Sequence, residues 1–252
     1  MTQTAFLASV TSAAEALTAA GNGADIIDGK DPARGALGAL PAATVAAIRA
    51  AVPREIQVSA TIGDLPADPM TLVAAARACA ASGCDLVKIG FFPGGDTPAA
   101  IAALGAMDIA PARIVGLLLA DLDPDFGLIA AMAAAGFAGV MLDTADKRGR
   151  LPEQMAPVAL ARFVTTAHQH GLFAGLAGSL RLSDVAGLLR LKPDVLGFRG
   201  ALCVNADRTS VLSGDAVAAI RAEIGRQAGD PGGPDARVRR AAHARPAWRG
   251  HD

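Results

Sequence analysis

The feature that most constrains the fold is a repeated alternation of short apolar segments with Ala-rich helical segments. The apolar segments are hydrophobic at consecutive positions, as in strands of a parallel sheet that are buried on both faces. Eight such units of about thirty residues predict a single-domain (β/α)8 barrel over residues 1–227, with an open doubly wound sheet as the alternative. No GxGxxG motif follows the first strand, which argues against a dinucleotide-binding sheet. The expected strands are 6–10, 24–28, 56–62, 85–91, 113–120, 139–143, 172–177 and 195–199, and the expected helices are 12–21, 41–51, 69–82, 97–106, 125–135, 157–170, 183–190 and 213–226.

The composition narrows the class of protein. Hydrophobic residues make up 52% of the 252 residues, which suffices for a large core, and the net charge of −1 gives no sign of a nucleic-acid or membrane surface. No apolar run reaches membrane-spanning length unbroken, and the N-terminus lacks the basic segment of a signal peptide. Three cysteines without a CxxC motif favour a reduced, cytoplasmic protein without a metal site. Residues 228–252, rich in Gly, Pro and Arg, are expected to form a flexible tail.

Four lysines stand against nineteen arginines, and three of the four lie where expected strands end. These are Lys30, Lys88 and Lys147. Arg stays charged in proteins, whereas a buried Lys can lose its proton and act as a nucleophile or a base. A chain that otherwise prefers Arg therefore indicates an amine function at these positions. The alternative is that a few lysines simply persist in an Arg-biased sequence.

Charged residues of both signs gather at the predicted mouth of the barrel, where active sites of this fold lie. Strand 2 delivers Asp28 and Lys30, strand 4 carries Lys88, and strand 6 delivers Asp143 with Lys147 four residues later. Since side chains alternate along a strand, Asp28 and Lys30 are expected to share a face. Such a cluster suits Schiff-base catalysis, in which burial and neighbouring cations lower the pKa of the attacking amine and carboxylates transfer protons. A ring of structural salt bridges is the alternative.

Two further carboxylates, Asp64 and Asp121, follow strands 3 and 5. The sequence Asp121-Leu-Asp123 precedes a proline and an expected helix. We therefore interpret it as helix capping and not as a metal site.

The segments after strands 7 and 8 predict a phosphate site. Gly178 and Ser179 can offer backbone N–H groups and a hydroxyl, and Arg199 and Gly200 can add a guanidinium and another N–H. Barrels of this type commonly bind phosphate at this place. Tight turns without a ligand are the alternative.

With these residues in view, the chain resembles the (5-formylfuran-3-yl)methyl phosphate synthase family of methanofuran biosynthesis. The resemblance runs from about residue 6 to about residue 225 and excludes the tail. The segments that carry it are GADIIDGKDPARGALGA, VSATIGD, DLVKIGFF, MLDTADK and LAGSL.

The resemblance implies a barrel enzyme without an added cofactor that condenses two molecules of glyceraldehyde 3-phosphate, with loss of one phosphate and of water. It also implies that Lys30 is the Schiff-base lysine and Lys88 the proton acceptor, and that Asp28, Asp143 and Lys147 belong to the active site. The partner is then a small triose phosphate, with no nucleic acid and no membrane.

The segment DGKDP departs from the expected family pattern at Gly29, where an apolar residue is usual, and at Asp31, where Asn is frequent. Gly29 puts the positioning of the strand end in doubt, but it removes no reacting group.

Other functions stay open at this point. A class I aldolase-like enzyme would form the same Schiff base on another sugar phosphate, and a decarboxylase or epimerase would use an Asp-x-Lys pair as acid and base. A non-catalytic phosphate-binding barrel would bind without turnover. The second of two phosphates is expected near Lys147, Arg148 or Arg150, and the sequence leaves open whether the chain forms a homo-oligomer.

Overall fold

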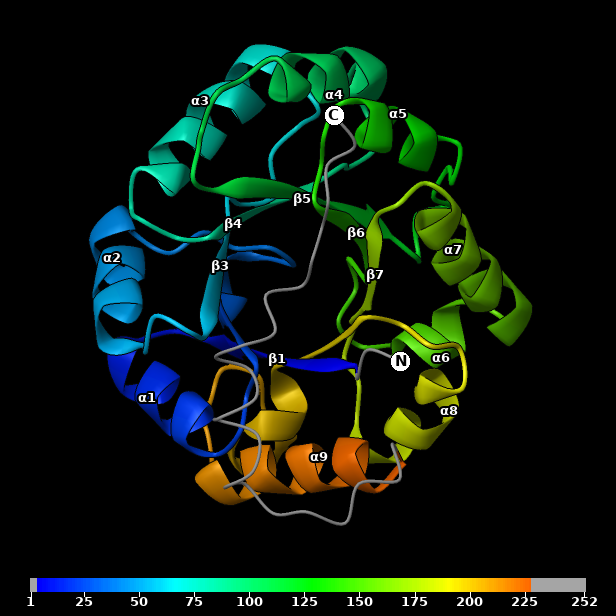
Figure 1. Ribbon diagram of the computed structural model, residues 1–252. Helices are drawn as coiled ribbons and strands as arrows, with labels where there is room; N and C mark the ends of the chain where they lie inside the picture. The colour runs from blue at the N-terminus through cyan, green and yellow to red at the C-terminus, as the bar shows by residue number, and fades with distance from the viewer. Residues whose placement is uncertain (1–3, 228–252) are drawn as a thin grey trace.

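A closed barrel of parallel strands forms the centre of the molecule. The computed structural model describes residues 4–227, so the predicted tail at 228–252 lies outside the described residues. Within residues 4–227, eight strands pair in the order of the sequence and β8 returns to β1, which confirms the (β/α)8 barrel and excludes the open sheet (Figure 1). The strands are β1 (Ala5–Val10), β2 (Ile26–Gly29), β3 (Gln57–Thr61), β4 (Leu86–Gly90), β5 (Arg113–Leu119), β6 (Gly139–Asp143), β7 (Phe173–Leu176) and β8 (Val195–Phe198).

The helices form an outer ring around the strands (Figure 1). The helix expected at 125–135 begins only at Leu128, because the side chain of Asp125 accepts a hydrogen bond from Gly127 N–H in a preceding turn. The helix expected at 183–190 is preceded by a short 3₁₀ turn and begins at Val185. A short helix at Leu151–Gln154 was not predicted. The helices are α1 (Ala13–Gly21), α2 (Ala42–Ala51), α3 (Pro69–Ala80), α4 (Thr97–Gly105), α5 (Leu128–Ala134), α6 (Leu151–Gln154), α7 (Pro157–Gln169), α8 (Val185–Leu189) and α9 (Gly214–Gln227), with 3₁₀ turns η1 (Pro32–Arg34), η2 (Leu182–Asp184), η3 (Gly200–Leu202) and η4 (Val204–Ala206).

The inside of the barrel changes from apolar to polar along the strands. Side chains alternate along a strand, so residues two apart point to the same face. The strand register places Ser9 opposite Asp28, and Asp28 opposite Ser59, which forms a polar layer above the apolar one. The pairs in which an apolar inner residue precedes a polar one are Leu7 and Ser9 in β1, Ile26 and Asp28 in β2, Leu86 and Lys88 in β4, and Met141 and Asp143 in β6.

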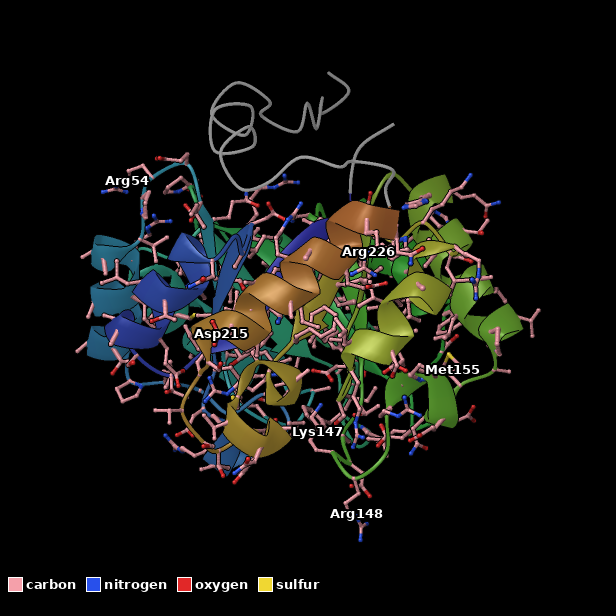
Figure 2. The ribbon with its side chains drawn as sticks, turned by 90° about the horizontal axis from the view of Figure 1, so that it is seen from below. Arg54, Lys147, Arg148, Met155, Asp215 and Arg226 are labelled. Atoms are coloured by element: carbon pink, nitrogen blue, oxygen red, sulfur yellow. The ribbon has the colours of Figure 1, made fainter. Side chains whose placement is uncertain are left out.

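The polar layer lies toward one end of the barrel. Figure 2 shows Lys147 and Arg148 at this end, whereas Arg54 and Arg226 lie toward the opposite one. The carboxyl ends of the strands therefore carry the candidate site, as the fold predicts. Among residues 4–227, no helix combines the length and the apolar character needed to cross a membrane.

Candidate active site

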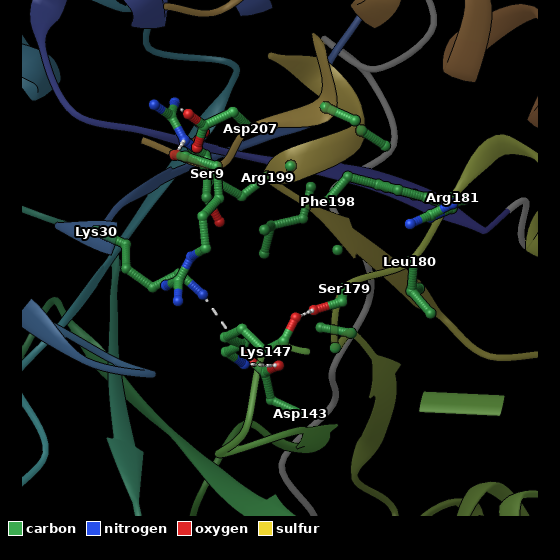
Figure 3. A pocket seen from close by; sticks show the side chains of 18 of the residues that line it. Ser9, Lys30, Asp143, Lys147, Ser179, Leu180, Arg181, Phe198, Arg199 and Asp207 are labelled. Carbon is green, nitrogen blue, oxygen red and sulfur yellow. Dashed lines mark hydrogen bonds and ion pairs between the residues drawn. The ribbon is translucent and has the colours of Figure 1, made fainter. Parts of the chain in front are cut away.

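A cavity of about 270 Å³ opens at the carboxyl ends of the strands. Its lining includes Lys30, Lys88, Asp143 and Lys147 together with the segments that follow β7 and β8 (Figure 3). Lys30 is only 6% exposed and Lys88 only 3%, yet both face this space. The fold thus brings the three strand-end lysines into one cavity. Asp28 lies beneath it, fully buried.

Lys88 and Asp28 form a buried ion pair between β4 and β2. Lys88 Nζ lies 3.1 Å from Asp28 Oδ2, and Asp28 accepts hydrogen bonds from Ser9 Oγ at 2.8 Å and from Ser59 Oγ at 2.7 Å. Burial lowers the pKa of Lys88, against the attraction of Asp28. Burial alone would raise the pKa of Asp28, but the charges of Lys88 and Lys30 and the two hydroxyl groups hold it below its usual range. This pair therefore combines an ionised carboxylate with an amine that gives up its proton more readily than a free lysine.

Asp143 connects the other two lysines. Asp143 Oδ2 lies 3.5 Å from Lys30 Nζ, and Oδ1 lies 2.5 Å from Lys147 Nζ, which also donates to the carbonyl of Thr144. Burial would raise the pKa of Asp143, but Lys147 and Lys30 hold it well below its usual range. Burial lowers the pKa of Lys147, and the attraction of Asp143 opposes this. Figure 3 shows Lys147 beside Asp143 at one side of the cavity, with Lys30 on the neighbouring side.

Two carboxylates at the mouth hold loops in place. Asp64 accepts hydrogen bonds from the backbone N–H groups of Ala36 and Leu37, at 2.8 and 2.7 Å, in the loop that follows Lys30. Asp121 does the same for the loop that leads to Lys147, where it accepts from residues 145 and 146 at 2.8 and 2.7 Å. The interpretation of Asp121 as a helix cap is therefore wrong, because its oxygens are used by the neighbouring loop. The sequence could not show this contact, because Asp121 lies 24 and 25 residues from its two backbone donors.

The turns after β7 and β8 line the cavity. Gly178 has φ 111° and Ser179 has φ 48°, a sharp turn in the left-handed region that the missing Cβ of glycine eases. Ser179 Oγ donates to the carbonyl of Lys147 at 3.0 Å, which leaves its N–H for another partner. Among the described residues, the N–H groups of Ser179 and Gly200 donate no hydrogen bond. Both residues line the cavity, so this edge offers two backbone donors from which an anion could accept hydrogen bonds.

Arg199 lines the cavity, but its guanidinium is held by the protein. Its nitrogens lie 2.6 and 3.3 Å from the two carboxylate oxygens of Glu15 and donate to the carbonyls of Ser9, Arg208 and Ser210. Burial would raise the pKa of Glu15, and Arg199 and the donors of Thr11 lower it below its ordinary value. The sequence could not reveal this partner, because Glu15 lies 184 residues away in α1.

The two arginines expected near the second phosphate point elsewhere. The side chain of Arg148 is 91% exposed and pairs with Asp146, and it projects into solvent in Figure 2. Arg150 pairs with Glu153 and Asp184. Neither lines the cavity.

Sequence reasoning missed several residues of the site. Ser9 and Ser59 contact Asp28, and Arg208 lines the cavity from the loop after β8. A serine next to apolar residues inside an expected strand is the signal that could have identified Ser9 and Ser59. Within residues 4–227, no three His, Cys, Asp or Glu side chains gather as a metal site would require.

The chain is similar in sequence to one family of proteins and in fold to other barrels. A family model described as 4-HFC-P synthase matches residues 6–221. A Methylorubrum extorquens protein provisionally named (5-formylfuran-3-yl)methyl phosphate synthase is 48% identical over 213 residues, which cover 84% of this chain and 88% of the relative. The (5-formylfuran-3-yl)methyl phosphate synthase of Methanothermobacter thermautotrophicus is 36% identical over 221 residues, with coverages of 82% and 93%. Phosphoribosyl anthranilate isomerase from Thermus thermophilus superposes with a TM-score of 0.61 at 16% identity, over 88% of this chain and 98% of that chain, which supports the fold alone.

Proposed function

The chain belongs to the 4-HFC-P synthase family, and from this membership we propose that it converts two molecules of glyceraldehyde 3-phosphate to (5-formylfuran-3-yl)methyl phosphate through a Schiff base on Lys30. Membership makes the protein a synthase of methanofuran biosynthesis. The observation that supports the Schiff-base mechanism is that two buried lysines and one half-buried lysine line one cavity and pair with two buried carboxylates. This combination suits imine formation followed by repeated proton transfer.

The atoms of the product define the reaction. Two triose phosphates differ from the furan by one phosphate and two waters. The formyl carbon, the ring carbon that bears it and the next ring carbon come from a donor triose that loses its phosphate. The carbon that bears the phosphate, and the other two ring carbons, come from an acceptor triose. The acceptor first isomerises from aldehyde to ketone, as a proton moves from its central carbon to C1 through an enediol, and the central carbon is then attacked. The reaction therefore needs an electron sink on the donor and proton transfer on both substrates.

Lys30 is the nucleophile in this proposal. Its ion pair with Asp143, at 3.5 Å, is the longest of the three that involve a cavity lysine. Lys147 is held at 2.5 Å by Asp143 and Lys88 at 3.1 Å by Asp28. Attack of Lys30 Nζ on the donor aldehyde and loss of water give an iminium. Loss of the proton from the adjacent carbon then gives an enamine, whose electrons expel the phosphate.

The other charged residues transfer the protons. Burial lowers the pKa of Lys88, so its free amine can take the proton from the donor, and Asp28 holds the resulting ammonium. Asp143 lies between Lys30 and Lys147 and can pass a proton between the imine side and the acceptor. The enol carbon that lost the phosphate then attacks the acceptor ketone and forms the carbon–carbon bond. The terminal hydroxyl of the acceptor closes the ring on the central carbon of the donor, two waters leave, and hydrolysis of the imine releases Lys30.

The turns after β7 and β8 suit a phosphate of the substrate. Ser179 and Gly200 line the cavity, and their N–H groups have no described partner. Backbone donors of this kind bind phosphate oxygens in many barrels. Arg199 supports this edge in the proposal by fixing the segment after β8, since its guanidinium is occupied by Glu15.

Borohydride trapping tests the proposal. The protein is incubated with glyceraldehyde 3-phosphate, reduced and digested, and the added mass is located by mass spectrometry while the solution is scanned for furan absorbance. We expect an adduct on Lys30, a furan aldehyde phosphate in solution, and neither in Lys30→Arg. Lys192→Arg is the matched control, because this lysine lies in a loop outside the cavity.

Other outcomes point elsewhere. An adduct without a furan would favour a class I aldolase-like enzyme. Furan formation by Lys30→Arg would exclude the Schiff base on this residue. Phosphate binding without an adduct or a furan would favour a non-catalytic barrel.

A further inference from the structure

Two arginines at the cavity form no ion pair with the residues that the structure describes. The positively charged side chains that line the cavity are Lys30, Lys88, Lys147, Arg181, Arg199 and Arg208. All but Arg181 and Arg208 form ion pairs within residues 4–227. Arg181 is exposed to solvent, whereas Arg208 is half-buried. A half-buried guanidinium that faces a cavity without a counter-ion is suited to an anionic ligand.

Arg208 reaches across the mouth from one loop to another. It lies in the segment that follows β8, and its side chain donates one hydrogen bond, at 3.0 Å, to the carbonyl of Gly35 in the loop after β2. No other hydrogen bond of this guanidinium is formed to the described residues, so most of its five N–H donors are available. Burial lowers the pKa of Arg208, against the attraction of Asp143, which lies too far away to form an ion pair.

The protein fixes the position of Arg208 through its backbone. Arg199 Nε donates to the carbonyl of Arg208 at 2.9 Å, and another nitrogen of the same guanidinium donates to the carbonyl of Ser210 at 3.0 Å. Glu15 in turn holds Arg199. Replacement of the Arg208 side chain therefore keeps these two backbone contacts of its loop and removes only the hydrogen bond to Gly35.

Two triose phosphates carry two phosphate groups, and the backbone donors after β7 and β8 suit one of them. We propose that Arg208 binds the other phosphate, which makes it a substrate-binding residue of the synthase reaction. This inference rests on the proposed function, because that function requires two phosphates at one mouth. A planar guanidinium matches phosphate oxygens through paired N–H donors. Arg208 then takes the place that the sequence suggested for Arg148 or Arg150.

The test compares Arg208→Gln with Arg148→Gln, which removes one positive charge at the same end of the barrel but outside the cavity. We expect Arg208→Gln to raise the KM for glyceraldehyde 3-phosphate by about 10- to 100-fold, the usual range for loss of a charge-assisted hydrogen bond. Arg148→Gln should match the wild type. Trapping of D-glyceraldehyde, which lacks phosphate, on Lys30 should be equal in all three proteins. Arg208→Lys should recover part of the lost affinity.

Calorimetric titration with inorganic phosphate tests the same site without turnover. The wild type and Arg148→Gln should bind two phosphate ions per chain, and Arg208→Gln only one. Equal KM and equal phosphate binding in both Gln variants would overturn the inference, as would an equal loss of D-glyceraldehyde trapping, which indicates a structural role. Absence of a furan from the wild type would instead count against the proposed function, and the phosphate titration would still decide the role of Arg208.

Discussion

The two halves of the mouth are built by different means. On the side of β2, β4 and β6, the site consists of side-chain charges that are buried and paired, as in Lys88 with Asp28 and Lys147 with Asp143. On the side of β7 and β8, the cavity is lined by backbone N–H groups of the turns at Ser179 and Gly200. Of the two arginines in the loop after β8 that line the cavity, Arg199 is occupied by Glu15, and Arg208 forms no ion pair with the described residues.

This difference predicts different responses to mutation. Each charged group in the first half is balanced by a partner in a place where water is scarce, so removal of one group leaves another charge buried and uncompensated. Apart from the cation of Arg208, the second half depends on the direction of backbone N–H groups, so a change of another side chain matters mainly where it distorts a turn. Substitutions in the first half should therefore affect chemistry and stability together, and those in the second half should mainly affect phosphate affinity.

The largest effect is expected for Asp143→Asn. This change leaves the ammonium groups of Lys30 and Lys147 without their shared carboxylate, which should lower the free energy of unfolding by about 3–5 kcal/mol. Turnover should fall by about 10²- to 10⁴-fold, since a proton carrier is lost. Urea unfolding and furan absorbance measure the two effects. Asp146→Asn, an exposed carboxylate in the same loop, should change neither, and equal effects of both variants would contradict the contrast between buried and surface charge.

The second-largest effect is expected from acidification, which should destabilise the half of the mouth on the side of β2, β4 and β6. The pKa of Asp28 and that of Asp143 are lowered in the folded protein relative to about 3.9 in an unfolded chain. Below that value the unfolded chain binds more protons, so the stability that these carboxylates provide is complete above pH of about 4 and is lost as pH falls through their folded values. The urea midpoint measured from neutral to acidic pH should fall less steeply in Asp143→Asn than in the wild type. Parallel curves would show that Asp143 has no such role.

A glycine substitution should separate the second half from the first. In Gly178→Ala the new Cβ would lie 2.9 Å from Thr144 Cγ2 at a φ of 111°, so the turn must shift at a cost of about 1–3 kcal/mol. We expect a KM for glyceraldehyde 3-phosphate that is raised several-fold, with unchanged trapping of D-glyceraldehyde on Lys30. Gly171→Ala, at a φ of 71° with no atom within 4 Å of the new Cβ, is the control before β7. It should lower stability slightly without changing KM.

The smallest effect is expected for Ser179→Ala. Its hydroxyl donates to the carbonyl of Lys147 at 3.0 Å, and its backbone N–H is kept in the variant. Loss of one such hydrogen bond costs about 0.5–1.5 kcal/mol. Steady-state kinetics should show less than about a threefold change in KM. A large loss of phosphate binding would mean that the hydroxyl, and not the backbone, is the ligand.

The sequence predicted the elements of the barrel better than their contacts. Consecutive apolar residues identified all eight strands of the described chain, because a strand that is covered on both faces must be apolar throughout. The same pattern predicted that Lys30, Lys88 and Lys147 lie at one mouth of the barrel, because the parallel strands of a closed barrel all end there. The partner of each charge was not predictable. Lys30 lies beside Asp143 across the barrel at 3.5 Å, and this distance depends on how the strands are arranged around the axis.

What the sequence determined by itself is the local pattern: which segments are strands, which residues end them, and which chemistry those residues can perform. Local pattern suffices because strand and helix periodicity are properties of neighbouring residues. The tertiary structure decided which groups are free to bind a ligand. Arg199 and Arg208 lie nine residues apart in one loop, yet Glu15 neutralises the first and no described carboxylate pairs with the second. Only the closed barrel brings α1 to the loop after β8, because β8 pairs with β1, and that contact decides which arginine remains available.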